Sequence, residues 1–136
     1  PFNLGVRTAG GYTQFIIPRN STVPTEATHV FTTVTDNQSS VRIQVVQGNS
    51  KIAEENQLLG EFALSDIPAA NAGVPQIEVT FSIDANGILE VSARDLMSQK
   101  EQSIVVQASS YLSKEELLEL KEASSSGEIK DRQASS

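Results

Sequence analysis

Apolar and polar residues alternate most regularly between residues 74 and 95, in the stretch VPQIEVTFSIDANGILEVSARD. Alternation with a period of two is typical of β-strands that bury one face. It is interrupted at Ala85-Asn86-Gly87, where turn-forming residues gather, and it resumes afterwards. The stretch therefore predicts an antiparallel hairpin with one apolar face, and such a face requires a second layer to pack against.

The length of the turn fixes which residues of this hairpin face one another. A two-residue loop at Asn86-Gly87 would place Ile83 opposite Glu90, and it would mix apolar and polar side chains along the whole pair. A three-residue loop with Gly87 in the left-handed region keeps the two faces separate. This register predicts the cross-strand pairs Ile83–Leu89, Phe81–Val91, Val79–Ala93, Thr80–Ser92 and Glu78–Arg94.

Shorter runs of β-prone residues occur through the rest of the first 108 positions. Residues 29–35 and 41–47 are expected to form a second hairpin across the polar loop 35–40. Together these runs predict a mainly β fold, an antiparallel β-sandwich of about eight strands. The other strands are expected at 4–8, 12–17, 60–64 and 101–108, with a brief helical turn at 52–55.

The pattern changes beyond the last of these strands. Ser113 and Glu116 form a capping box, in which the serine oxygen accepts from a free N–H at the start of a helix. A helix is therefore predicted at about 113–123. The serine-rich chain from Ser124 onward is expected to be disordered. The predicted parts are a β-sandwich domain at 1–111 and a C-terminal part with the helix and the tail at 112–136.

The composition narrows the possible functions. The 136 residues, of which 38% are hydrophobic, suffice for one domain with its own core. A net charge of -7 without a basic run argues against binding to nucleic acid or to an anionic membrane surface. No apolar run has the length needed to span a membrane, and the absence of cysteine excludes disulfides and thiolate chemistry.

Candidate catalytic residues are scarce. His29 is the only histidine, so a metal cluster or a Ser-His-Asp triad would have to be built around it. A partly exposed structural histidine at the start of a strand is the favoured interpretation. The acidic pairs Glu54-Glu55 and Glu115-Glu116 fit solvated faces. The sequence therefore predicts no catalytic residue, no metal site and no enzymatic activity.

Two segments, 6–9 and 31–34, carry small or β-branched side chains beside flexible loops. This composition fits either the core of a sandwich or a groove with apolar pockets, and the pattern alone favours the core. Four longer segments are more specific: LGVRTAGG at 4–11, IPRNSTVPT at 17–25, VFTTVTDNQSSVRIQVVQG at 30–48 and PQIEVTFSIDANGILEVSARD at 75–95. Together they resemble the peptide-binding domain of the 70-kDa heat-shock chaperone family in its bacterial and mitochondrial form.

The resemblance implies a β-sandwich that holds an extended, apolar-centred segment of an unfolded polypeptide in a groove, with a helical lid that begins near Ser113. The groove would have one central pocket for a leucine-like side chain, and Ala9 and Val34 would arch over the peptide. The residues implied to line the pocket are Val6, Thr8, Phe31, Thr32, Val41 and Ile43, and those implied to contact the peptide backbone are Ala9, Thr32, Val34, Gln38 and Ser40.

The resemblance also implies partners outside this chain, which begins with Pro1 and is expected to be part of a longer protein. An ATPase domain that binds ATP and Mg would precede it, and Arg19 and Pro24 would contact that domain. A J-domain co-chaperone and a nucleotide-exchange factor would act on the full-length protein in the bacterial cytoplasm or, alternatively, the mitochondrial matrix. This chain alone is expected neither to hydrolyse ATP nor to retain peptide for long.

The chain departs from the family pattern in three places. Ala72 stands where many bacterial relatives have an arginine that pairs with Asp36 to latch lid and loops, so loss of this latch is expected. Asn86 replaces a common aspartate in the turn that faces the ATPase domain, which predicts altered coupling. The small arch side chains of Ala9 and Val34 predict a looser enclosure of peptide than methionine or tyrosine would give.

Two other functions remain open at the level of sequence. The first is a structural or adhesive β-sandwich whose apolar residues all belong to the core. The second, and least favoured, is a hydrolase that uses His29. A groove would also permit self-association, because segment 117–120 or the C-terminal tail of a neighbouring copy resembles an apolar ligand.

Overall fold

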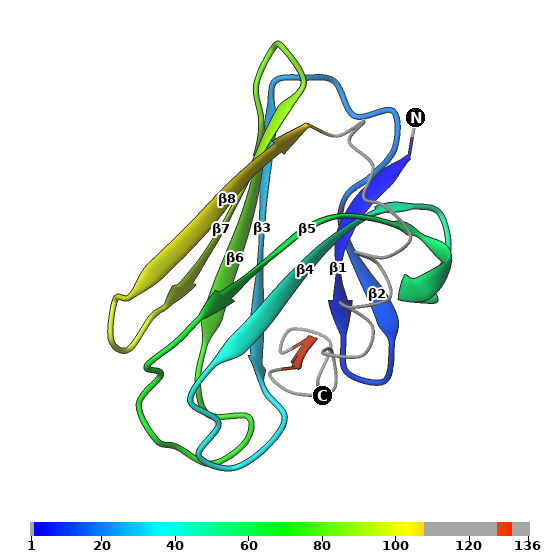
Figure 1. The fold of residues 1–136 in the computed structure, drawn as a ribbon. Helices are drawn as coiled ribbons and strands as arrows, with labels where there is room; N and C mark the ends of the chain where they lie inside the picture. Colours follow the sequence, from blue (N-terminus) through cyan, green and yellow to red (C-terminus); the bar gives the residue numbers. More distant parts are fainter. Residues whose placement is uncertain (1, 108–127, 132–136) are drawn as a thin grey trace.

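The computed structural model of the protein describes residues 2–107 and 128–131, and nine strands in these residues form two antiparallel sheets (Figure 1). The strands are β1 (Asn3–Thr8), β2 (Tyr12–Ile17), β3 (Thr25–Thr33), β4 (Val41–Gly48), β5 (Gln57–Leu64), β6 (Ile77–Ile83), β7 (Ile88–Asp95), β8 (Glu101–Gln107) and β9 (Ile129–Asp131). One sheet has the order β2-β1-β4-β5 and the other β8-β7-β6-β3-β9. The expected mainly β class is therefore confirmed.

The hairpin of β6 and β7 has the register that the alternation predicts. Phe81 faces Val91, and all the other predicted cross-strand pairs are present. The three-residue loop closes with the Asp84 N–H donating to the Ile88 carbonyl at 3.0 Å. Gly87 has a φ of 80°, a left-handed conformation that glycine adopts without strain.

The core lies between the two sheets and draws side chains from both. Val6 and Val45 come from the four-stranded sheet, Phe81 and Val91 come from the five-stranded sheet, and each is 0% exposed. These residues occupy the inward positions of their alternating strands. Because each such side chain contributes about 1.5–3 kcal/mol on burial, alternation is the main reason that the two sheets pack together.

The second predicted hairpin, between residues 29–35 and 41–47, is wrong. The strand at the first position, β3, pairs with β6 and β9, whereas β4 lies between β1 and β5 in the other sheet. The connection between β3 and β4 therefore crosses from one sheet to the other. Alternation defines the inward face of a strand, but both sheets offer an apolar face, so the pattern did not distinguish the two partners.

Two shorter predictions have different outcomes. The brief helical turn is confirmed as the 3-10 helix η1 (Ala53–Glu55). The predicted helix at 113–123 lies outside the described residues.

The described residues contain no helix with the length and apolar character that a membrane crossing requires.

The expectation of a disordered chain from Ser124 onward is wrong for Ile129–Asp131, which form β9. β9 pairs in antiparallel fashion with the end of β3. Its physical basis is the burial of Ile129, which is 0% exposed, within the core. A single apolar residue among charged neighbours gives too short a pattern to predict a strand.

Candidate functional site

The segment formed by residues 128–131 lies between β1 and β3, the strands expected to border a groove. Along β3, Thr32 is opposite Lys130 and Thr33 is opposite Ile129. On the other side, the backbone N–H of Ala9, just after β1, donates to the carbonyl of Ile129 at 2.7 Å. Figure 1 shows β9 as a short red arrow beside the ends of these two strands. We call residues 128–131 the resident segment, because they occupy this place between the strands.

The side chain of Ile129 is buried in the place predicted for a pocket. It belongs to the same core cluster as the four apolar residues expected to line that pocket. All five side chains are 0% exposed, so the chain's own side chains fill this place and it does not open to solvent. The other four are Val6, Phe31, Val41 and Ile43.

The two remaining residues predicted for the pocket have different surroundings. Thr32 is 2% exposed and pairs with Lys130 of the resident segment. The hydroxyl of Thr8 donates to the carbonyl of Tyr12 at 3.2 Å, so in this structure it holds the turn between β1 and β2. Thr33, which the sequence analysis did not select, is fully buried opposite Ile129.

Gln38 ties the loop after β3 to the resident segment. Its Oε1 accepts from the backbone N–H of Val34 at 3.0 Å. Its Nε2 donates to the carbonyl of Ser40 at 2.9 Å and to the carbonyl of Glu128 at 3.0 Å. The predicted backbone-contacting residues Val34, Gln38 and Ser40 are therefore joined through one amide. Its contact with the resident segment is to the main-chain carbonyl of Glu128, so it imposes no requirement on the side chain at position 128.

Asp36, which the resemblance assigns to a latch with an arginine, instead forms a hydrogen bond with main chain. Its Oδ1 accepts from the backbone N–H of Ala72 at 2.8 Å. The neighbouring N–H of Asn37 donates to the carbonyl of Ala70 at 2.8 Å. The side-chain latch was expected to be lost at position 72, and the main chain at that position instead bonds to the aspartate.

The residues predicted to contact another domain lie in the loop between β2 and β3. Arg19 and Pro24 are both exposed there. The backbone N–H of Arg19 donates to Oδ1 of Asn3 at 2.8 Å. In Figure 1 this loop is at the opposite end of the sandwich from β9, so it lies away from the resident segment.

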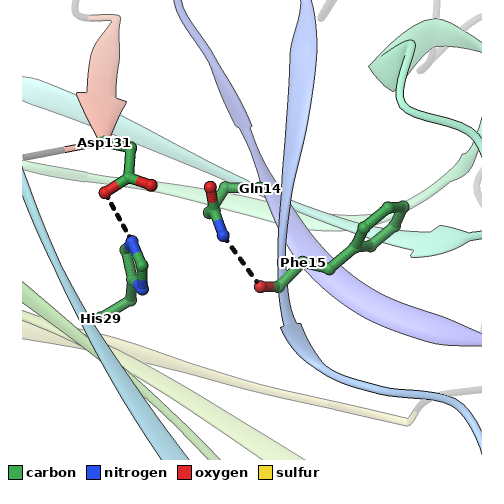
Figure 2. Close-up of polar contacts among 4 residues, drawn as sticks. All are labelled: Gln14, Phe15, His29 and Asp131. Atoms are coloured by element: carbon green, nitrogen blue, oxygen red, sulfur yellow. Dashed lines mark hydrogen bonds and ion pairs between the residues drawn. The ribbon is translucent and has the colours of Figure 1, made fainter. Parts of the chain in front are cut away.

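His29 makes a contact that the sequence analysis missed. Its Nε2 lies 2.6 Å from Oδ1 of Asp131, with the two side chains 20% and 16% exposed. Figure 2 shows the imidazole and the carboxylate pointing toward one another, and in the same view the amide of Gln14 donates to the carbonyl of Phe15 at 3.2 Å. The two residues are 102 positions apart, and no local pattern relates them.

Other chemistry is not assembled around this site. Among residues 2–107 and 128–131, no group of three or more histidine, aspartate or glutamate side chains is placed to hold a metal ion. His29 has a carboxylate neighbour, but the buried hydroxyls of Thr32 and Thr33 make no hydrogen bond within the described chain. The arrangement therefore combines apolar burial, main-chain hydrogen bonds and the contact between His29 and Asp131.

Comparison with known proteins identifies the family. The family model described as Hsp70 protein matches residues 1–136. The chain belongs to the Hsp70 family. A relative described as Chaperone protein DnaK, from Mycoplasmopsis synoviae (strain 53), is 53% identical over 117 residues, which cover 86% of this chain. The matched region covers only 20% of that Hsp70 relative, so this chain corresponds to a fifth of its length.

Proposed function

We propose that this chain is a non-enzymatic peptide-binding module of an Hsp70 chaperone. It would bind extended segments of unfolded polypeptides between β1 and β3, and one apolar side chain of each segment would enter the pocket now filled by Ile129. The bacterial DnaK relative favours the cytoplasm as its location, with the mitochondrial matrix as the alternative. ATP hydrolysis, J-domain co-chaperones and nucleotide-exchange factors would belong to the longer protein.

The observation that carries this proposal is the resident segment itself. A strand of three residues supplies a fully buried isoleucine, and it is held by a short pairing with β3 and one hydrogen bond from Ala9. Its main chain bonds to Ala9 and to Gln38 without involving the identity of its side chains. This is the arrangement that a peptide ligand would have if it replaced the resident segment.

The expected affinity follows from these contacts. One buried isoleucine or leucine contributes about 1.5–3 kcal/mol. Each strand-like main-chain hydrogen bond adds about 0.5–1.5 kcal/mol and does not depend on sequence. At the upper end of these ranges, one anchor and three such bonds approach about 8 kcal/mol, the free energy of a micromolar complex, with little selection beyond the anchor. Such binding suits a chaperone that acts on many unfolded chains.

The first experiment is to measure the binding of a fluorescent leucine-rich heptapeptide to the wild-type chain and to Ile129→Ser. The serine no longer fills the pocket, so the external peptide should bind about tenfold more tightly or better. An all-charged heptapeptide should bind neither protein. Fluorescence anisotropy gives both affinities.

A second substitution tests the pocket. In the Ile129→Ser protein, Val41→Phe should fill the pocket and abolish binding of the leucine-rich peptide. Val91→Phe, at another fully buried valine of the core, serves as the control. It perturbs packing to a comparable degree but should leave the affinity of the folded protein unchanged. Equal affinities with and without Val41→Phe would refute the pocket assignment.

A structural or adhesive β-sandwich is the second candidate function. It is favoured by the complete burial of Phe31, Val41 and Ile43 against the chain itself. In that case Ile129 is an ordinary core residue. Ile129→Ser would then destabilise the fold, and neither protein would bind any of a set of unrelated apolar peptides.

A further inference from the structure

The register of β9 on β3 determines which of its side chains face inward. Ile129 is opposite Thr33, and Asp131 is opposite Phe31. Residues directly opposite each other in an antiparallel pair share a face of the sheet. Phe31 and Ile129 both belong to the core cluster between the sheets, so the face that Ile129 and Asp131 share is the inward face. Lys130, between them, is exposed on the other face.

His29 is the next residue of β3 on that same inward face, two positions before Phe31. It is thus the diagonal neighbour of Asp131 across the strand pair, a distance that long side chains reach. Nε2 of His29 and Oδ1 of Asp131 are 2.6 Å apart. The imidazole also packs beside the ring of Phe31, with centroids 5.0 Å apart and an angle of 50° between the planes. The strand and the neighbouring ring therefore fix where the imidazole points.

The chemistry of this contact is directional. A carboxylate only accepts hydrogen bonds, so Nε2 of His29 donates to it. A hydrogen bond to an ionised group is stronger than one between neutral groups, and partial removal from water strengthens it further. An amide or an apolar side chain at the position of Asp131 would make a weaker contact with the imidazole.

We propose that His29 is a second recognition position of the groove, selective for a carboxylate two residues after the anchor. The inference rests on the proposed peptide-binding function and specifies its substrate class. Any peptide that lies antiparallel to β3, with its apolar anchor in the place of Ile129, presents the residue two positions later to His29. The residue between the two faces outward, as Lys130 does, and is not selected.

The experiment uses three nine-residue peptides built around one leucine in an otherwise neutral polar sequence. The first has aspartate two residues after the leucine, the second has aspartate two residues before it, and the third has asparagine two residues after it. The first two have the same charge and composition, so their difference isolates position. Each peptide competes with the same resident segment, so ratios of affinity within one protein are free of that competition.

With the wild-type chain, the first peptide should bind about tenfold more tightly than the other two. In His29→Ala, all three should bind with similar affinity. Equal binding of all three peptides by the wild-type chain would overturn the inference and leave the peptide-binding function intact. Retention of the preference in His29→Ala would assign it to another residue and overturn the role of His29. If none of the peptides binds either protein, the proposed function fails and the inference fails with it.

The resident segment provides a second measurement. Asp131→Asn should weaken the docking of the resident segment, so that a leucine-rich peptide without acidic residues binds several-fold more tightly. In the His29→Ala background, Asp131→Asn should have a smaller effect than in the wild-type chain, because the contact with the imidazole is already lost. Equal effects of Asp131→Asn in the two backgrounds would show that the two side chains are not coupled, and would contradict the inference.

Discussion

The two edges of β3 carry strands of very different character. On one edge, β6 pairs with β3 over the run from Thr25 to Phe31, and it continues directly into the β6–β7 hairpin. On the other edge, the three residues of β9 pair only with the run from Phe31 to Thr33. Phe31 is thus opposite Ile77 on one side and Asp131 on the other.

The difference indicates which edge is scaffold and which edge can exchange its partner. β6 has seven residues in a continuous sheet and is fixed by pairing on both of its sides. β9 has a pairing partner on one side and accepts one hydrogen bond from the backbone N–H of Ala9. The carbonyl of Glu128, just before β9, accepts one more from the side chain of Gln38. A short edge strand with one buried side chain opens at a lower free-energy cost than a central strand.

The largest expected effect compares isoleucines on the two edges. Ile77 and Ile129 are both 0% exposed and belong to the same core cluster. Ile77→Ala should lower the free energy of unfolding by about 2–5 kcal/mol, because it leaves a cavity in a strand that cannot detach. Ile129→Ala should cost less than half of that, because β9 can leave while both sheets remain folded. Urea unfolding followed by circular dichroism measures both losses.

Equal losses in these two variants would contradict the comparison. They would mean that β9 is as integral to the sheet as β6, and they would favour the structural sandwich over the peptide-binding module.

An intermediate effect is expected at Gln38, whose amide reaches the carbonyl of Glu128. In the Ile129→Ser background, where the resident segment no longer fills the pocket, Gln38→Leu should weaken binding of the leucine-rich peptide about fivefold, because one main-chain contact is lost. Gln99 provides the control, since its Nε2 donates to the carbonyl of Leu96 in the turn between β7 and β8. Gln99→Leu should leave the affinity unchanged. The same loss of peptide affinity in both variants would show that Gln38 does not contact the bound peptide.

The smallest expected effect is a pH-dependent change in stability at Glu61 on β5, in the four-stranded sheet. Burial raises the pKa of Glu61 above its usual value, and Arg42 and a hydrogen bond with Gln44 only partly oppose this. The folded protein therefore keeps a proton on Glu61 at pH values where the unfolded chain has released it. Stability contributed by the protonated form is thus lost as the pH rises from the unfolded value through the higher folded value.

Glu61→Gln should accordingly raise the melting temperature slightly at pH 7. The difference from the wild-type chain should vanish below about pH 4, where the glutamate is protonated in both states. Thermal unfolding at several pH values tests this sign. A difference that is constant with pH would show that burial of the charge is not its cause.

The sequence predicted the β6–β7 hairpin completely because the relevant information is local. Three loop residues and the alternation on either side leave one register that separates apolar from polar faces. The same reasoning failed for β3 and β4, whose partners lie in different sheets. Alternation specifies a face, whereas the choice of sheet depends on contacts that are distant along the chain.

The candidate site was predicted unevenly for the same reason. Val6, Phe31, Val41 and Ile43 were selected through family resemblance, and they lie in one cluster. The occupant of that cluster, Ile129, stands alone among polar residues and has no periodic signal. The contact between His29 and Asp131 depends on the register of β9 on β3. The sequence around His29 and the sequence around Asp131 do not specify this register.

The bond between Asp36 and the main chain at position 72 has a consequence for how freely the loops can vary. An arginine latch is lost with any substitution of the arginine, but a backbone N–H is present whatever side chain is attached. Proline alone lacks this donor. The hydrogen bond that joins the two loops therefore does not depend on the side chain at position 72, and every residue except proline supplies its donor.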